Sequence, residues 1–190
     1  MKYRLVTVAA LLAVASVATA QKASSVRLEF RPFAGMYVPV GSQADDFKTA
    51  ATYGFQSAVE LNANTHVLAS VGWTNGRSKI GALTDDAANL WHYDVGAELN
   101  GLKELGYGWL FRPFVGVGAG ARTYEYQQVG LSKSTCGAGY AALGSEFQTG
   151  PVALRLESRG YLNCFKSPFT GRKLNRSDAM FSLGFAYHVN

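Results

Sequence analysis

The stretch RPFVGVGAGARTYEY, Arg112–Tyr126, places a glycine at every second position from Gly116 to Gly120. Valine and alanine stand between the glycines, so one face of the segment is apolar and the other has almost no side chains. Side chains of a β-strand point alternately to the two faces of a sheet, and the pattern therefore predicts a strand. The glycines indicate that its second face borders a crowded space. A weaker echo, RPFAGMYVPV, begins at Arg31.

The same two-residue alternation runs through most of the chain, and no segment carries the apolar stripe of a helix. It predicts eight strands, at 26–40, 52–62, 65–75, 90–100, 109–126, 139–148, 152–162 and 179–189. The connections alternate between short and long, as in an up-and-down meander. A tight turn at Thr149-Gly150 would pair Gln148 with Pro151.

The first twenty residues differ from the rest of the chain. Lys2 and Arg4 flank the start of an apolar run, and Ala18-Thr19-Ala20 matches a signal-peptidase site. We expect residues 1–20 to be a cleaved signal peptide and residues 21–190 to form one domain. Without Lys2 and Arg4 the 18 basic side chains fall to 16, against 13 acidic ones, too mild a balance to indicate nucleic-acid binding. No later apolar run reaches the roughly 20 residues of a membrane helix.

Alternation alone leaves three folds open: a soluble sandwich, a soluble lipocalin-like barrel and a transmembrane barrel. The polar face holds arginine, glutamate and glycine, whereas a face in water would favour lysine, serine and threonine. A narrow barrel interior fits this composition, because buried charges must be paired and small residues make room for them. The residues that we expect in this lumen charge network are Glu29, Arg31, Glu60, Glu98, Arg112, Arg122, Glu146, Arg155 and Glu157.

The opposite face carries valine, leucine and alanine between two sets of aromatic residues. Those towards the long connections are Tyr53, Trp73, Trp91 and Tyr93, and those towards the short ones include Trp109, Phe111, Phe147 and Phe185. Aromatic belts at both rims are typical of a lipid-facing band, and a closed barrel crosses lipid without open sheet edges. The sequence thus predicts an all-β, eight-stranded antiparallel up-and-down transmembrane β-barrel.

On these features the chain resembles the small bacterial outer-membrane β-barrel proteins of the OmpA/OmpX type. The resemblance covers the chain after residue 20 and rests on RPFVGVGAG (112–120), ALGSEF (142–147), VALRLESRGY (152–161) and FSLGFAYHVN (181–190). It implies a monomer in the outer membrane, contact with lipid and lipopolysaccharide, and insertion by the outer-membrane assembly machinery. Members of the family typically end in an aromatic residue, whereas this chain ends in Asn190.

The resemblance also places the long connections outside the cell. Cys136 and Cys164 then lie at the outer ends of neighbouring strands, and an even cysteine count in an exported chain favours a bridge. In the register given above the two cysteines miss each other by one residue. The candidates for contact with lipopolysaccharide phosphates are Lys166, Arg172, Lys173 and Arg176 in the last connection.

The sequence has no pattern for catalysis, a metal or a cofactor. His66, His92 and His188 are isolated and lack a nucleophile motif, the cysteines lack metal-type spacing, and Asp45-Asp46 lacks the spaced ligands of a calcium site. We therefore expect a non-enzymatic outer-membrane protein that acts through its extracellular loops. A narrow channel for small or hydrophobic solutes is the alternative, and a lipid A-modifying enzyme is the third hypothesis.

Overall fold

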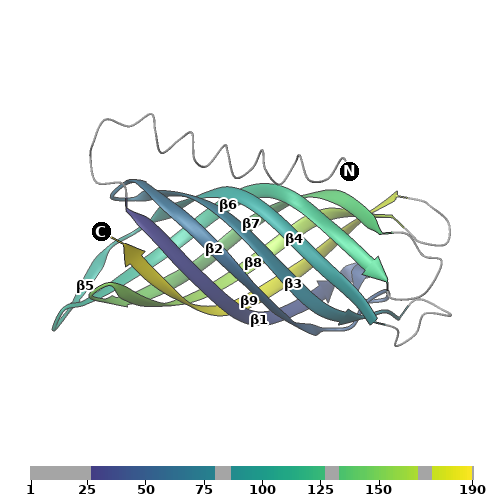
Figure 1. Cartoon of the computed structure of the whole chain (residues 1–190), viewed down its shortest axis with the longest axis horizontal. Coiled ribbons are helices and arrows are strands. Elements are labelled where there is room, and N and C mark those ends of the chain that lie inside the picture. Colours follow the sequence, from purple (N-terminus) through teal and green to yellow (C-terminus); the bar gives the residue numbers. More distant parts are fainter. Residues whose placement is uncertain (1–26, 80–86, 127–132, 167–172, 190) are drawn as a thin grey trace.

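The structure is a computed structural model of the whole chain, and it describes residues 27–79, 87–126, 133–166 and 173–189. These residues form a closed barrel whose strands run obliquely around one axis (Figure 1). The strands are β1 Leu28–Val40, β2 Ala50–Asn62, β3 Thr65–Arg77, β4 Ala87–Asn100, β5 Lys103–Gly106, β6 Trp109–Tyr126, β7 Ser134–Thr149, β8 Val152–Lys166 and β9 Lys173–Val189. The predicted all-β antiparallel barrel is confirmed.

Apart from β4 and β5, strands that follow one another in the sequence pair antiparallel, and the pairing of β1 with β9 and of β4 with β6 closes the barrel. The short β5 continues the register of β4, since Asn100 pairs with Phe114 and Lys103 with Phe111. The ladder breaks between them at Pro113, which has no N–H to donate. Its carbonyl still accepts the Gly101 N–H at 2.8 Å. β4 and β5 therefore act as one strand, and the described residues form an eight-stranded barrel.

We call the end that carries the turns Ala63-Asn64 and Gly150-Pro151 the turn end, and the opposite end the loop end. The turn end is on the left of Figure 1, where β5 and the end of β9 lie. A 3-10 turn, η1 (Gly41–Gln43), follows β1 at the loop end. Among the described residues no helix is both long and apolar enough to cross a membrane.

Several strands extend further towards the loop end than the alternation predicted. β7 begins at Ser134 and not at residue 139, β8 continues to Lys166, and β9 begins at Lys173. The added segments are mostly small or polar, so they carry no apolar alternation that would reveal them. The turn between β7 and β8 lies at Gly150-Pro151 and not at the predicted Thr149-Gly150, because Thr149 pairs with Val152. Gly150 has a φ of 58°, which suits glycine.

The two faces of the barrel are inverted relative to a water-soluble protein. On β6, Val115 and Val117 are 59% and 64% exposed, whereas Arg112 and Arg122 are 9% and 1% exposed. The same division holds on β8, where Leu154 and Leu156 face outward. A sandwich or a lipocalin-like barrel would bury the aliphatic residues and expose the arginines, so both alternatives are excluded.

Candidate functional site in the barrel interior

A network of ion pairs fills the turn-end half of the lumen. Arg155 of β8 lies near its centre and contacts Glu98, Glu146 at 2.7 Å and Glu157 at 2.9 Å. Arg31 of β1 donates to Glu29 at 2.5 and 2.8 Å and to Glu98 at 2.9 Å. Glu98 of β4 therefore joins the two guanidinium groups, and the contacts connect strands that are distant in the sequence.

The turn-end network contains predicted residues together with others that complete it. Its members are Glu29, Arg31, Asp94, Glu98, Arg112, Glu146, Arg155, Glu157 and Arg159. Arg159 contacts Glu157 and reaches Asp94 at 3.2 Å, while Tyr161 donates to Asp94 at 2.7 Å. Such charges are tolerable away from water because each lies near an opposite charge, and all but Arg112, which donates to Gln148, are hydrogen-bonded to that partner.

Two predicted members of the lumen charge network lie outside the turn-end network. Glu60 is paired with the largely exposed Arg27, at 3.9 Å. Arg122 lies nearer the loop end, where it pairs with Asp178 at 3.1 Å and covers the ring of Tyr161 at 3.8 Å. Alternation placed both residues on the polar face, but it could not assign their partners.

The glycines of β6 make room for these interior groups. A Cβ atom at Gly118 would lie 2.4 Å from the ring of Tyr140, and one at Gly120 would lie 2.0 Å from the carbonyl oxygen of Tyr93 and 2.5 Å from Asp94 Oδ1. All three distances are far below van der Waals contact. The missing side chains therefore leave space for Tyr140 and for the Asp94 carboxylate, as the opening stretch of the sequence indicated.

An aromatic cluster fills the loop-end half of the lumen. We define this loop-end cluster as Tyr37, Phe47, Ala88, Leu90, Tyr124, Tyr126 and Phe165, all buried. Phe47 comes from the connection between β1 and β2, and its ring packs 5.5 Å from Tyr124 and 5.7 Å from Phe165. Gln43, also buried, donates hydrogen bonds to the hydroxyls of Tyr37 at 3.0 Å and Tyr124 at 3.2 Å. The β1–β2 connection thus closes the loop end of the lumen.

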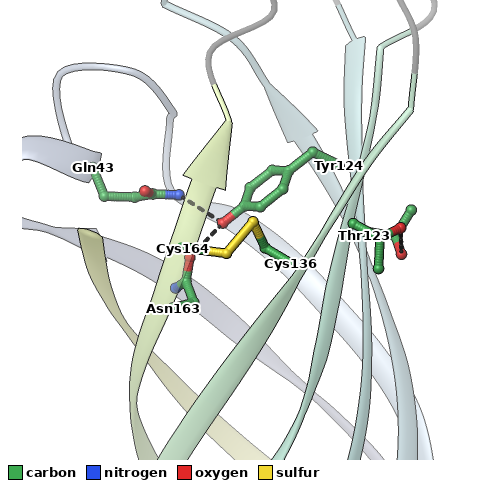
Figure 2. The surroundings of a disulfide bond; sticks show 7 residues. Gln43, Thr123, Tyr124, Cys136, Asn163 and Cys164 are labelled. Atoms are coloured by element: carbon green, nitrogen blue, oxygen red, sulfur yellow. Dashed lines mark hydrogen bonds between the residues drawn. A yellow bond between two sulfur atoms is a disulfide. The ribbon is translucent and has the colours of Figure 1, made fainter. Parts of the chain in front are cut away.

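A disulfide links Cys136 of β7 to Cys164 of β8, beside Tyr124, Asn163 and Gln43 (Figure 2). It lies where the two strands part. The β7–β8 ladder ends at Ala138 and Asn163, whereas β6–β7 continues to Ser134 and β8–β9 to Lys166. The predicted bridge between Cys136 and Cys164 forms. The two cysteines can be one residue out of register because they lie beyond the last paired residues of the β7–β8 ladder.

The candidate lipopolysaccharide contacts are placed only in part. Arg172 lies outside the described residues, and Lys166 pairs with Lys173 at the end of the β8–β9 ladder. Arg176 contacts Asp46 and lies over the ring of Phe165. Partial burial raises the pKa of the Asp46 carboxyl above its ordinary value, and Arg176 acts in the opposite direction. The Arg176 side chain is therefore engaged by Asp46 and the loop-end cluster.

Aromatic residues surround the outside of the barrel. Tyr53, Trp73 and Trp91 of β2, β3 and β4 form a row with ring centroids 6.2 and 6.4 Å apart. Phe111 and Phe147 pack 5.1 Å apart near the turn end. With exposed valine and leucine between these sets, the outer surface matches a band that contacts lipid at both interfaces. Exterior and interior together define a transmembrane-type β-barrel with a filled lumen.

Comparison with known proteins supports this class. No protein-family model and no curated protein matches the chain. The structure is similar to the Neisserial surface protein A, with 11% identity, a TM-score of 0.64, and coverage of 88% of this chain and 99% of that one. It is also similar to the N-terminal β-barrel domain of Pseudomonas aeruginosa OprF, with 16% identity, a TM-score of 0.56, and coverage of 86% and 97%. The chain therefore has the fold of the eight-stranded outer-membrane β-barrels.

Proposed function

We propose that this protein is a non-enzymatic integral outer-membrane protein whose barrel anchors its loop end at the cell surface for interaction with partners. The inverted surface carries this proposal: exposed valine, leucine and aromatic residues surround an interior of buried arginine, glutamate and tyrosine. Such a surface is stable only where lipid replaces water around it. The likeness to a Neisserial protein that is described as a surface protein is consistent with this role.

The filled lumen weighs against the narrow channel. The turn-end network occupies one half, and the loop-end cluster with Gln43 occupies the other. Solutes would have to break paired charges and displace Phe47 to pass. An eight-stranded barrel has an interior that side chains just fill, which agrees with this arrangement.

The histidines weigh against a lipid-modifying enzyme. His66, His92 and His188 are all buried and share the lumen face of their strands. His92 packs against Phe33 at 6.2 Å, and His66 and His188 face Glu29. A lipid substrate lies on the opposite face of the wall, beyond the reach of a general base in the lumen.

Cell fractionation combined with gel mobility tests the proposal. We expect the protein in the outer-membrane fraction, a faster band without boiling than with boiling, no steady conductance in planar bilayers, and unchanged lipid A by mass spectrometry after overexpression. Recovery of the protein in the soluble fraction, with the same gel mobility with and without boiling, would overturn the membrane assignment. Stable unitary conductance would favour the channel, and altered lipid A would favour the enzyme.

A further inference from the structure

The β5–β6 hairpin carries an open sheet edge at the turn end of the barrel. In the described part of the chain, each of the other strands pairs on both sides, whereas β5 pairs with β6 alone. The neighbouring β3 begins only at Thr65, so its ladder with β4 stops at Leu99. β5 continues past this point, all four of its residues are exposed, and the hairpin extends beyond the other strand ends at the left of Figure 1. The turn end therefore has a short edge that is free to pair.

The hydrogen bonds just before β5 show which backbone groups face this edge. The Asn100 N–H donates to the β2–β3 turn at 2.8 Å, away from β6, whereas the Gly101 N–H donates to Pro113 of β6 at 2.8 Å. The N–H and C=O of one strand residue point to the same side, and successive residues alternate. The backbone groups of Leu102 and Glu104 are therefore directed at the open edge. The edge presents two donors and two acceptors before the register shift that follows Glu104.

Apolar side chains lie on the face of the hairpin that is turned away from lipid. Leu102 lies opposite Arg112 in the register of the ladder and is 63% exposed. Leu110 pairs with Gln148, whose side chain accepts a hydrogen bond from Arg112 at 3.3 Å. This face of the hairpin therefore continues the lumen face past the end of the barrel, whereas lipid contacts the opposite face. The exposed leucine at this position is removed from water only when another molecule binds there.

Tyr107 at the tip of the hairpin has a strained backbone and an exposed ring. It forms a two-residue turn with Gly108, and its φ of 53° lies in the left-handed region that disfavours a bulky side chain. Asparagine or glycine is the unstrained choice at this position of such a turn. The Tyr107 side chain is fully exposed, so packing within the chain does not offset the strain. Strained residues of this kind are concentrated at binding and catalytic sites, which points to a contact outside the chain.

We propose that the β5 edge binds an extended segment of another polypeptide, which pairs with Leu102 and Glu104 as an added strand. Apolar side chains of that segment would pack against Leu102, Tyr107 and the half-exposed Leu105. In strand addition the main-chain hydrogen bonds supply affinity and the neighbouring side chains supply specificity, and the hairpin offers both. Lys103 and Glu104 cancel in charge, so the hairpin has no charged surface for phosphate or nucleic acid.

A second copy of this chain does not fit the edge. Two copies in one membrane would be related by a two-fold axis along the membrane normal, and the strands run obliquely to the barrel axis (Figure 1). Their β5 strands would then cross instead of lying antiparallel. With the loop end at the cell surface, as in the proposed function, the bound segment belongs to a periplasmic protein. The pairing with β5 itself does not depend on that orientation.

Photocrosslinking of the full chain in the cells that naturally produce it tests the proposal. The photoreactive residue benzoylphenylalanine replaces Tyr107, and we expect a crosslinked protein product. The same residue in place of Asn64, in the neighbouring β2–β3 turn, is the control and should give none. Glu104→Pro removes an edge N–H without taking a donor from β6, and it should reduce the product at least about fivefold, the effect of one lost hydrogen bond. Glu104→Ala removes the same carboxylate but keeps the N–H, so its product should be unchanged.

The outcomes separate strand addition from other contacts. The proposal is overturned by no crosslinked protein at position 107, by crosslinks to lipid alone, by an equal product at position 64, or by a product that persists in Glu104→Pro. If that variant does not fold, as judged by its gel mobility without boiling, amide hydrogen exchange of the parent protein decides. Slower exchange at Leu102 and Glu104 in isolated outer membranes than in detergent micelles supports strand addition, and equal exchange contradicts it. A protein that fractionates with the outer membrane but gives no crosslink contradicts this proposal alone and leaves the proposed function standing.

Discussion

The two halves of the lumen are filled by different chemistry. In the turn-end network the side chains are held by oppositely charged partners, and Glu98 between Arg31 and Arg155 connects three strands. In the loop-end cluster, aromatic rings pack around Phe47, which belongs to a connection and not to a strand. Removing one residue from the first half leaves an unpaired charge, whereas removing one from the second leaves a cavity. The comparison therefore predicts different costs for equally buried residues.

The largest effect is expected for Arg155→Leu. The substitution leaves Glu98, Glu146 and Glu157 short of a partner, and breaking a buried network in this way costs about 4 kcal/mol of unfolding free energy. Urea unfolding in lipid vesicles measures it. Arg27→Leu is the control, because its exposed pair with Glu60 contributes little. Similar midpoints for the two variants would show that the network does not stabilise the barrel.

Phe47→Ala should have the next largest effect. It opens a cavity among Tyr124, Tyr126 and Phe165 and should cost about 3 kcal/mol by the same measurement. Planar-bilayer recordings should still show no steady conductance, because the turn-end network continues to fill the other half. Tyr107→Ala, at a fully exposed turn position, serves as the control. A conducting Phe47→Ala barrel would mean that the loop-end cluster alone closes the lumen.

Gly120→Ala should have the smallest effect of the three. The added methyl group meets the backbone oxygen of Tyr93 and the Asp94 carboxylate, and overpacking of this kind costs about 2 kcal/mol. Gly160→Ala is the matched control, since its added methyl group would have no neighbour within 4 Å. Equal urea midpoints for the two alanine variants would contradict the view that β6 glycines are required by the crowded lumen.

The sequence was sufficient to predict which face of each strand is inside, because alternation is a local property of the chain. Glu29, Glu98 and Arg155 were assigned to the lumen on that basis and lie in one network. Their partners could not be predicted, since these depend on the stagger of strands around a closed barrel. The pairings of Arg122 with Asp178 and of Glu60 with Arg27 are of this kind.

The remaining features leave almost no local signal. Gln43 and Phe47 lie in a connection, where no periodicity marks a residue as buried. The number and position of the cysteines predict their bridge. The register predicted for the two strands that carry them was wrong, because their turn lies at Gly150-Pro151 and not at Thr149-Gly150.

The bridge between Cys136 and Cys164 spans only 28 positions of sequence and a single hairpin, so it can form before the barrel exists. β7 and β8 would then be tethered at one end and joined by their turn at the other before the remaining strands pair with them. This limits how far the two strands can slide past each other. Glu146 of β7 and Arg155 and Glu157 of β8 would arrive as one prealigned group, around which the other strands assemble.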